Sequence, residues 1–359
     1  MDLVASAWMT RSLGEPVASV TLEEDGTVLV GGWDGSFKRW NEQGDLVWST
    51  QLNDRVNDVA VHHDCLVATA GLHLVCLERG TGEIRWSHPL EGSSDAVVVH
   101  DGTVYAVSSV YDIEHNDFLE SAVWSFGLDG VENWIQRMDE RPWTMMSFKG
   151  DLWIGLGRPR CGFALVQPDG TLVHSKGPVD SPVTSGDSSH DRILFGHADG
   201  TVSDDTATTI YTLPTGVESV ACVAEGSISA DEQGTLHAHA SKGEAGWTSK
   251  GHAVEAHCEG FAVKGTPSHW VARWSGIEGS LEVLNGKDGT SIAHAESMHV
   301  RFLQRLGDRI VAGCENGDIH VWDADVFERR LSATSKPAPA SENPRKSALQ
   351  DKLRKLRER

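Results

Sequence analysis

The chain has 359 residues, of which 39% are hydrophobic, and it carries a formal net charge of −21. Residues 336–359 hold eight basic and three acidic side chains, so this segment is +5 and the other 335 residues together carry −26. A body this acidic repels phosphates, which argues against nonspecific nucleic-acid binding, and no apolar run reaches the roughly 18 residues that a membrane helix needs.

The N-terminus predicts no secretory signal, because Asp2 is its second residue and no continuous apolar segment follows. The six cysteines are widely spaced without a CxxC pair, and several lie in apolar runs, as Cys76 does. Such thiols are typical of a reduced protein interior and not of a disulfide framework. We therefore expect a cytoplasmic protein.

The first structural unit covers residues 26–52, GTVLVGGWDGSFKRWNEQGDLVWSTQL. A β-branched run ends at Gly31-Gly32, a turn at Asp34-Gly35 follows, and a second run ends at Trp40. Asp-Gly between two alternating apolar runs is a strong hairpin signal. A third run, which contains Trp48, follows the turn at Gly44.

The same unit returns along the whole chain, as in residues 65–90, and one further apolar strand separates successive copies. Counting that strand as A, each unit has four short strands, A to D. The turns between strands B and C are expected near Gly35, Leu72, Ser121, Gly162, Gly200, Gly234, Gly279 and Gly317. Their spacing is about 40 residues, the period of propeller blades. The sequence thus predicts an all-β chain forming a single β-propeller of eight four-stranded blades over residues 1–331, with seven as the alternative because the fifth and sixth copies are poor in large apolar residues.

The ends of the predicted ring can also be read from the repeat. The segment AWMTRSLGEPVASV parallels VWSTQLNDRVNDVAV, so that Trp8 matches Trp48. A propeller has to hide the edges of its terminal blades. We expect an N-terminal strand at Leu3–Thr10 to complete the blade that contains Asp318–Trp322, with Val326–Leu331 as the competing strand.

The repeats resemble two propeller families. Residues 309–325, RIVAGCENGDIHVWDAD, are similar to a WD repeat that ends in Trp322-Asp323, and LVCLERGTGEIRWSHPL resembles the PQQ-type repeat. The resemblance implies the propeller fold but leaves the function open. The Gly-His pairs, at His197 and His252, lack a Trp-Asp at the right distance, and quinone-binding members carry an adjacent cysteine pair that this chain lacks. The resemblance therefore implies a PQQ-like repeat without quinone, and we expect no cofactor.

No compact metal-ligand or catalytic motif stands out. His237 and His239 share a strand face, but a third ligand has no obvious source, so no metal is expected. The insertion VYDIEHNDFLE at 110–120 does not match an EF-hand. It is interpreted as a solvated acidic loop, or alternatively as a loop that contacts a partner. No catalytic residue can be named, although a central channel could host a site.

The B–C and D–A loops of a propeller emerge on one face, which is the predicted partner-binding surface. Aromatic and arginine side chains are enriched at interaction hot spots. The residues expected there are Trp33, Arg55, Trp143, Arg158, Arg160, His197 and Trp274. The alternative is that the tryptophans pack between blades.

After Leu331 the composition changes. Residues 332–346 are rich in Ala, Pro and Ser and are expected to be a disordered linker. Residues 347–359 predict a basic amphipathic helix, with a capping-box pattern at Ser347 and Gln350. Its expected apolar face is Leu349, Leu353 and Leu356, and its basic residues include Lys352, Arg354 and Lys355. It would dock on a protein partner, touch nucleic acid or an anionic surface, or fold onto the acidic propeller.

Two functions fit these features. The favoured hypothesis is a non-catalytic, monomeric scaffold for protein–protein interaction that presents the loop face and is tethered by its C-terminal helix. The alternative is an enzyme or small-ligand binder with its site in the central channel.

Overall fold

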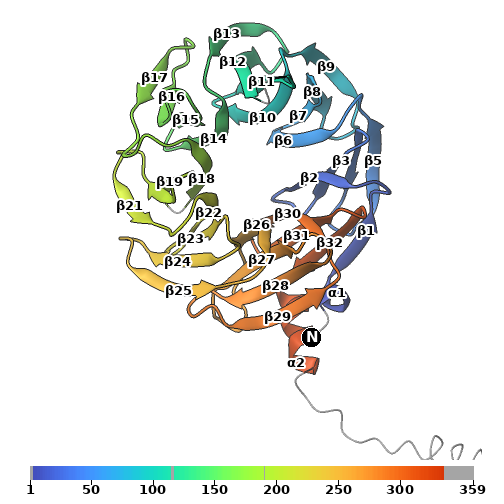
Figure 1. Ribbon diagram of the computed structural model, residues 1–359. Helices are drawn as coiled ribbons and strands as arrows, with labels where there is room; N and C mark the ends of the chain where they lie inside the picture. Colours follow the sequence, from blue (N-terminus) through green and yellow to red (C-terminus); the bar gives the residue numbers. More distant parts are fainter. Residues whose placement is uncertain (1–2, 115–116, 190, 335–359) are drawn as a thin grey trace, which may run out of the picture.

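The computed structural model describes residues 3–114, 117–189 and 191–334. In this part of the chain, eight four-stranded antiparallel sheets form a ring around a central axis, as Figure 1 shows. The weak fifth and sixth repeats each form a sheet of their own, β18–β21 and β22–β25. The eight-bladed propeller is confirmed, and the seven-bladed alternative is wrong.

Strands are lettered A to D from the axis to the rim. The eight A strands are β2 (Val17–Leu22), β6 (Val56–His62), β10 (Ser93–His100), β14 (Pro142–Phe148), β18 (Val183–Ser189), β22 (Val217–Val223), β26 (Ala253–Glu259) and β30 (Val300–Leu306). The B strands are β3 (Val28–Gly32), β7 (Cys65–Ala70), β11 (Thr103–Asp112), β15 (Asp151–Leu156), β19 (Arg192–His197), β23 (Gly226–Asp231), β27 (Ser268–Trp274) and β31 (Arg309–Cys314).

The C strands are β4 (Ser36–Trp40), β8 (His73–Glu78), β12 (Asp117–Gly127), β16 (Phe163–Val166), β20 (Thr201–Ser203), β24 (Leu236–Ala240), β28 (Gly279–Asn285) and β32 (Asp318–Asp323). The D strands are β5 (Leu46–Gln51), β9 (Ile84–Pro89), β13 (Glu132–Met138), β17 (Leu172–Ser175), β21 (Thr209–Thr212), β25 (Ala245–Ser249), β29 (Ser291–Glu296) and β1 (Met9–Ser12). Two short helices, α1 (Leu3–Ser6) and α2 (Ala324–Thr334), lie beside the last blade.

The hydrophobic core is divided among the seams between neighbouring blades. Eight clusters of buried residues are found, one at each seam of the ring. Strand B of each blade is covered on both faces by the adjoining blades, so β3 and β7 are buried along their whole length. This explains why B strands read as continuous apolar runs while the rim strands alternate.

A tryptophan of strand D joins neighbouring blades in the same way at four seams. The indole Nε1 of Trp48 donates to Arg79 O, that of Trp86 to Leu128 O, that of Trp134 to Pro168 O and that of Trp247 to Gly286 O, each at 2.9 Å. Every acceptor lies in the C–D turn of the next blade. A glycine of that turn lies under the indole ring, as Gly82 does beneath Trp48, where a Cβ would lie 2.6 Å from the ring. The tryptophans therefore join blades by a hydrogen bond as well as by apolar burial.

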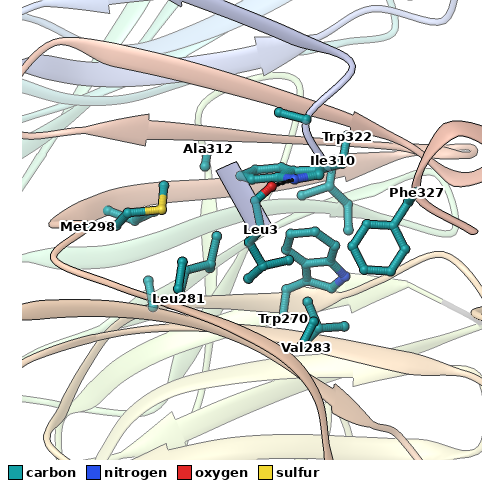
Figure 2. Packing of buried hydrophobic residues seen from close by; sticks show 14 of the residues in the cluster. Leu3, Trp270, Leu281, Val283, Met298, Ile310, Ala312, Trp322 and Phe327 are labelled. Carbon is teal, nitrogen blue, oxygen red and sulfur yellow. Dashed lines mark hydrogen bonds between the residues drawn. The ribbon is translucent and has the colours of Figure 1, made fainter. Parts of the chain in front are cut away.

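The ring is closed by the N-terminal strand, as predicted. Strand β1 pairs antiparallel with β32, so that Met9 faces Val321 and Ser12 faces Asp318. The strand is shorter than expected and displaced, because Leu3–Ser6 form helix α1 instead. Leu3 and Phe327 of α2 are both fully buried in one cluster with Trp270 and Trp322, which Figure 2 shows.

The competing C-terminal strand is wrong, because Val326–Leu331 lie within α2. Asp323 caps this helix by accepting a hydrogen bond from the Val326 amide at 3.2 Å. The spacing of Phe327 and Leu331 places both on one helical face, against the same core cluster as Leu3. The guanidinium of Arg330 then donates to Ala5 O and Ala7 O at 3.0 and 2.6 Å, which joins the two ends of the ring.

Candidate interaction face

Alternating strand directions place the B–C and D–A loops on one side of the disc, here called the loop face, and the A–B and C–D turns on the other, the turn face. One backbone hydrogen bond recurs on the loop face. The first residue after strand B donates to the last residue before strand A of the same blade. Examples are Trp33 to Pro16, Gly71 to Arg55, Gly157 to Arg141, Ala198 to Pro182, Glu232 to Gly216 and Glu315 to His299, at 2.8–3.1 Å. Loops joined in this way present side chains from a fixed backbone.

Side chains at or beside these two positions stack across seams. Trp33 follows strand B of the first blade, and Arg55 precedes strand A of the second. The Arg55 guanidinium lies 4.4 Å from the centroid of the Trp33 ring, and Trp33 remains 44% exposed. Trp274, the last residue of β27, and His299 form a similar pair between the seventh and eighth blades, with parallel rings whose centroids are 3.7 Å apart. The first pair is stabilised by the attraction of a cation for an aromatic face, and the second by ring stacking.

The predicted insertion is not a loop over most of its length. Strands β11 and β12 extend beyond their neighbours as a hairpin, in which Val110 faces Glu120 and Tyr111 faces Phe118. The aromatic rings of Tyr111 and Phe118 pack edge to face at 5.0 Å. The solvated-loop interpretation is therefore wrong for these residues, because cross-strand aromatic packing continues the ladder past the rest of the sheet.

The extended hairpin forms one side of an aromatic clamp around Arg141. The guanidinium carbon of Arg141 lies 3.9 Å from the Phe118 ring centroid and 4.1 Å from that of Trp143. Burial lowers the pKa of Arg141, and the nearby Asp95 carboxylate, 3.6 Å away, opposes this effect. Trp143 is 47% exposed. The two rings themselves pack edge to face, with centroids 6.1 Å apart, so Arg141 lies in the corner that they form. An arginine packed on aromatic rings at an open face has the composition of an interaction hot spot.

A pocket of about 380 Å³ opens beside this clamp. Residues from three successive blades line it: Phe118, Asp139, Arg141, Trp143, Gly157, Arg158, Pro159, Pro182 and Thr184. Gly157 is needed here, because a Cβ at this position would lie 2.8 Å from Trp143 Nε1. The pocket is therefore apolar on its walls and charged at its rim.

The structure sorts the residues predicted for this face. Trp33, Arg55, Trp143, Arg158 and Arg160 lie on the loop face and are exposed or stacked there. Trp274 is half-buried against His299.

Arg160 is already engaged, since it forms a bidentate pair with Glu140 at 2.6 and 2.8 Å. This pairing lowers the pKa of the Glu140 carboxyl.

His197 was predicted on the exposed face, and this is wrong. It is the last residue of β19 and is fully buried. Its ring lies 2.8 Å from Ser203 Oγ and 3.3 Å from Ser181 O, and burial lowers its pKa. A final strand residue whose side chain points into the seam is covered by the next blade, whereas the following loop residue is not.

Sequence reasoning missed Phe118 and Arg141. Arg141 could have been found, because it occupies the same repeat position as Arg55, directly before strand A. The tail residues Leu349, Leu353, Leu356, Lys352, Arg354 and Lys355 lie outside the described residues, so the predicted helix stays a prediction, as does the linker from residue 335 on. The predicted start of the linker at residue 332 is wrong, because residues 332–334 belong to α2.

The central channel holds one polar group of chemical interest. His257 Nε2 lies 2.7 Å from Ser219 Oγ, and His257 Nδ1 lies 2.9 Å from His269 Nε2. Burial lowers the pKa of His257 to about 4 and that of His269 well below its usual value. His257 lines a depression of about 350 Å³ between the A strands. Both imidazoles are therefore neutral near pH 7.

The two histidines singled out as possible ligands are used structurally. His237 Nε2 lies 2.8 Å from Asp231 Oδ2, and His239 stacks on Tyr211 with centroids 3.6 Å apart. Among the described residues, no group of three or more His, Cys, Asp or Glu side chains could hold a metal ion. Nor does any helix of that part of the chain have the length and apolarity to cross a membrane.

Comparison with known proteins agrees with this architecture: the chain is similar in fold to β-propellers with PQQ-like and WD repeats. The family model of the outer membrane protein assembly factor BamB matches residues 41–156. The crystal structure of BamB from Moraxella catarrhalis is similar at a TM-score of 0.70 with 16% identity, over 88% of this chain and 97% of that one. No curated protein matches the sequence.

Two further solved propellers extend the comparison. Sqt1 of Saccharomyces cerevisiae has a TM-score of 0.71 at 9% identity, over 88% of this chain and 98% of that one. BBS1N, crystallised in complex with ARL6DN, has a TM-score of 0.53 at 13% identity, over 89% of this chain and 96% of that one. At these identities the likeness defines the fold alone.

Proposed function

We propose that this protein is a non-catalytic scaffold that binds a protein partner on its loop face. The observation that carries the proposal is the clamp of Phe118, Arg141 and Trp143, where a partly buried guanidinium packs against two perpendicular rings at an open pocket. Aromatic and arginine anchors on a rigid backbone bind with little loss of conformational entropy. That BBS1N has been crystallised with ARL6DN is consistent with a propeller in this role.

The proposal has a second part, in which residues 347–359 tether the propeller to its partner. This segment is basic, with leucines at helical spacing, whereas the rest of the chain is strongly acidic. A short amphipathic helix of this kind gains stability by docking on a surface. The protein would act in the cytoplasm as a monomer.

The test is affinity capture from native lysate with four forms of the protein. These are the full chain, a form lacking residues 336–359, Trp143→Ala, and Leu46→Ala as a matched control. Leu46 is 53% exposed on the rim strand β5, away from the loop face. A scaffold should retain its partner in Leu46→Ala, lose it in Trp143→Ala, and hold it more weakly without the tail. Equal capture by the full chain and Trp143→Ala would remove the loop face from the proposal, and equal capture without the tail would remove the tether.

The alternative, a ligand or catalytic site in the central channel, has one observation in its favour, the Ser219–His257–His269 row beside the channel depression. Ser219 is only partly buried and its hydroxyl is already paired with His257 Nε2 at 2.7 Å, while His269 is fully buried. A thermal-shift screen of small metabolites against the wild type and His257→Gln would support the alternative if a compound stabilised only the wild type.

A further inference from the structure

The pocket beside the aromatic clamp has a charge pattern that defines its ligand more closely. Four charged side chains surround it: Arg141 and Arg158 are cationic, and Asp139 and Asp95 are anionic. Asp95 is the carboxylate nearest to Arg141, at 3.6 Å. Arg158 is exposed and has no ion pair among the residues that the structure describes. The two cations are therefore matched in number by two carboxylates, and Arg158 is the cation that forms no ion pair in the described part of the chain.

A second unmet hydrogen-bonding group points the same way. The Nε of Arg141 is buried without an acceptor in the described part of the chain, although the two rings fix the guanidinium plane. The neighbouring Arg160 is not available, since the buried Glu140 occupies it. An anion entering the pocket would meet Arg158 at the rim and the guanidinium edge of Arg141 further in.

The pocket lies beside an apolar surface that a small anion would leave uncovered. Trp143 is half-exposed and Pro159 is exposed, and both line the pocket together with Phe118 of the hairpin. A ligand that covers this surface needs large apolar groups next to its negative charge. An extended peptide with an acidic residue beside bulky apolar residues satisfies both requirements.

We propose that this pocket binds the side-chain carboxylate of an Asp or Glu in an extended partner segment, with a flanking apolar side chain packed on Trp143. The inference rests on the proposed function and names the chemistry of its partner. A monoanion matches Arg158, the cation of the pocket that forms no ion pair in the described part of the chain. A phosphate dianion is disfavoured because Asp139 lies on the rim and the body of the protein is strongly acidic.

The experiment pans a phage-displayed library of random linear peptides on the full chain, with counter-selection on Trp143→Ala. The expected consensus contains Asp or Glu next to a large apolar residue. The consensus peptide is then synthesised with a fluorescent label, and its binding is measured by anisotropy. Arg158→Ala should weaken binding about tenfold or more, as for loss of a charge-assisted hydrogen bond, and Arg158→Lys should weaken it less. Arg329→Ala, an exposed arginine on α2, is the matched control and should have no effect.

The outcomes separate this inference from the proposed function. A consensus that depends on Trp143 but lacks an acidic residue and ignores Arg158→Ala would overturn the carboxylate and leave the scaffold intact. Enrichment equal on the wild type and Trp143→Ala would overturn both. If a peptide with phosphoserine in place of the acidic residue bound more than tenfold more tightly, the pocket would be a phosphate site. If the protein dimerised with increasing concentration and Arg158→Ala abolished the dimer, the occupant would be a second copy of the chain. Either result would overturn the inference.

Discussion

The closure of the ring can be tested by truncating one buried leucine side chain at its N-terminus. Leu3 is fully buried between Trp270, Trp322 and Phe327, and its carbonyl accepts a hydrogen bond from Trp322 Nε1 at 2.9 Å. Leu3→Ala removes apolar volume from a packed cluster, which costs about 3 kcal/mol where the surroundings cannot collapse. With about 330 ordered residues, the entropy of unfolding is about 0.7 kcal/mol/K, so the melting temperature should fall by about 4 °C.

The matched control is Val4→Ala, one residue along the same helical turn and 38% exposed, which should shift the melting temperature by less than about 1 °C. Both are measured by scanning calorimetry, together with hydrogen exchange of β1. If the first residues detached before the ring unfolded, Leu3→Ala would speed exchange in β1 without lowering the melting temperature. Equal melting temperature and equal exchange in the two variants would refute the view that residues 3–12 are part of the closed ring.

Three further predictions concern the seams, the turn face and the channel. Gly82→Ala should lower the free energy of unfolding, measured in urea, by about 2 kcal/mol or more. At this residue φ is +73°, and the new Cβ would lie 2.6 Å from Trp48. Gly80→Ala is the control, because a Cβ there would have no atom within 4 Å. Glu23→Gln should lower the free energy of unfolding by about 3 kcal/mol. It removes the carboxylate that Arg39 and Arg79 share at 2.8 and 2.5 Å. Glu24→Gln, at the exposed neighbouring residue, is the control and should leave stability nearly unchanged. The pKa of His257 is about 4 in the folded state against 6.5 in the unfolded state, so the unfolded state binds a proton first as the pH falls. The free energy of unfolding should therefore decrease by an amount on the order of 3 kcal/mol between pH 6.5 and pH 4. His257→Gln should flatten this dependence of stability on pH, and the control substitution at an exposed histidine, His294→Gln, should not.

The fold could be predicted because each repeat contains turn residues and apolar runs that determine local structure. Asp34-Gly35 predicts its turn because φ at Gly35 is +87°, and a side chain there would collide with Leu52 O at 2.4 Å. The tryptophans of the D strands correctly indicated the rim strands. Their hydrogen-bond acceptors are carbonyls of the next blade, which the sequence pattern does not identify. The match of Trp8 to Trp48 indicated closure by the first strand, which the pairing of β1 with β32 confirms.

The errors have different physical origins, and each involves contacts that the sequence pattern does not show. Val326–Leu331 could form a strand or a helix on its own, and the buried site for Phe327 between α1 and the last blades favours the helix. The hairpin at 110–120 looked like a loop because its acidic residues suggested solvent, while the pairing of Tyr111 with Phe118 sets its length. His197 differs from a loop residue by a single position, and one residue changes which side of the sheet a side chain faces.

Arginines on both faces of the disc form ion pairs, and the loop face also carries Arg158, which has none in the described part of the chain. On the turn face, Arg39, Arg79, Arg85 and Arg305 form ion pairs with carboxylates of their own or neighbouring blades. Those guanidinium groups are already paired within the ring. On the loop face, Arg160 pairs with Glu140 and Arg141 with Asp95, whereas Arg158 has no ion pair among the described residues. In a chain this acidic, a cation without a carboxylate partner contributes little to the stability of the ring, whereas it can pair with an anionic group supplied by another molecule.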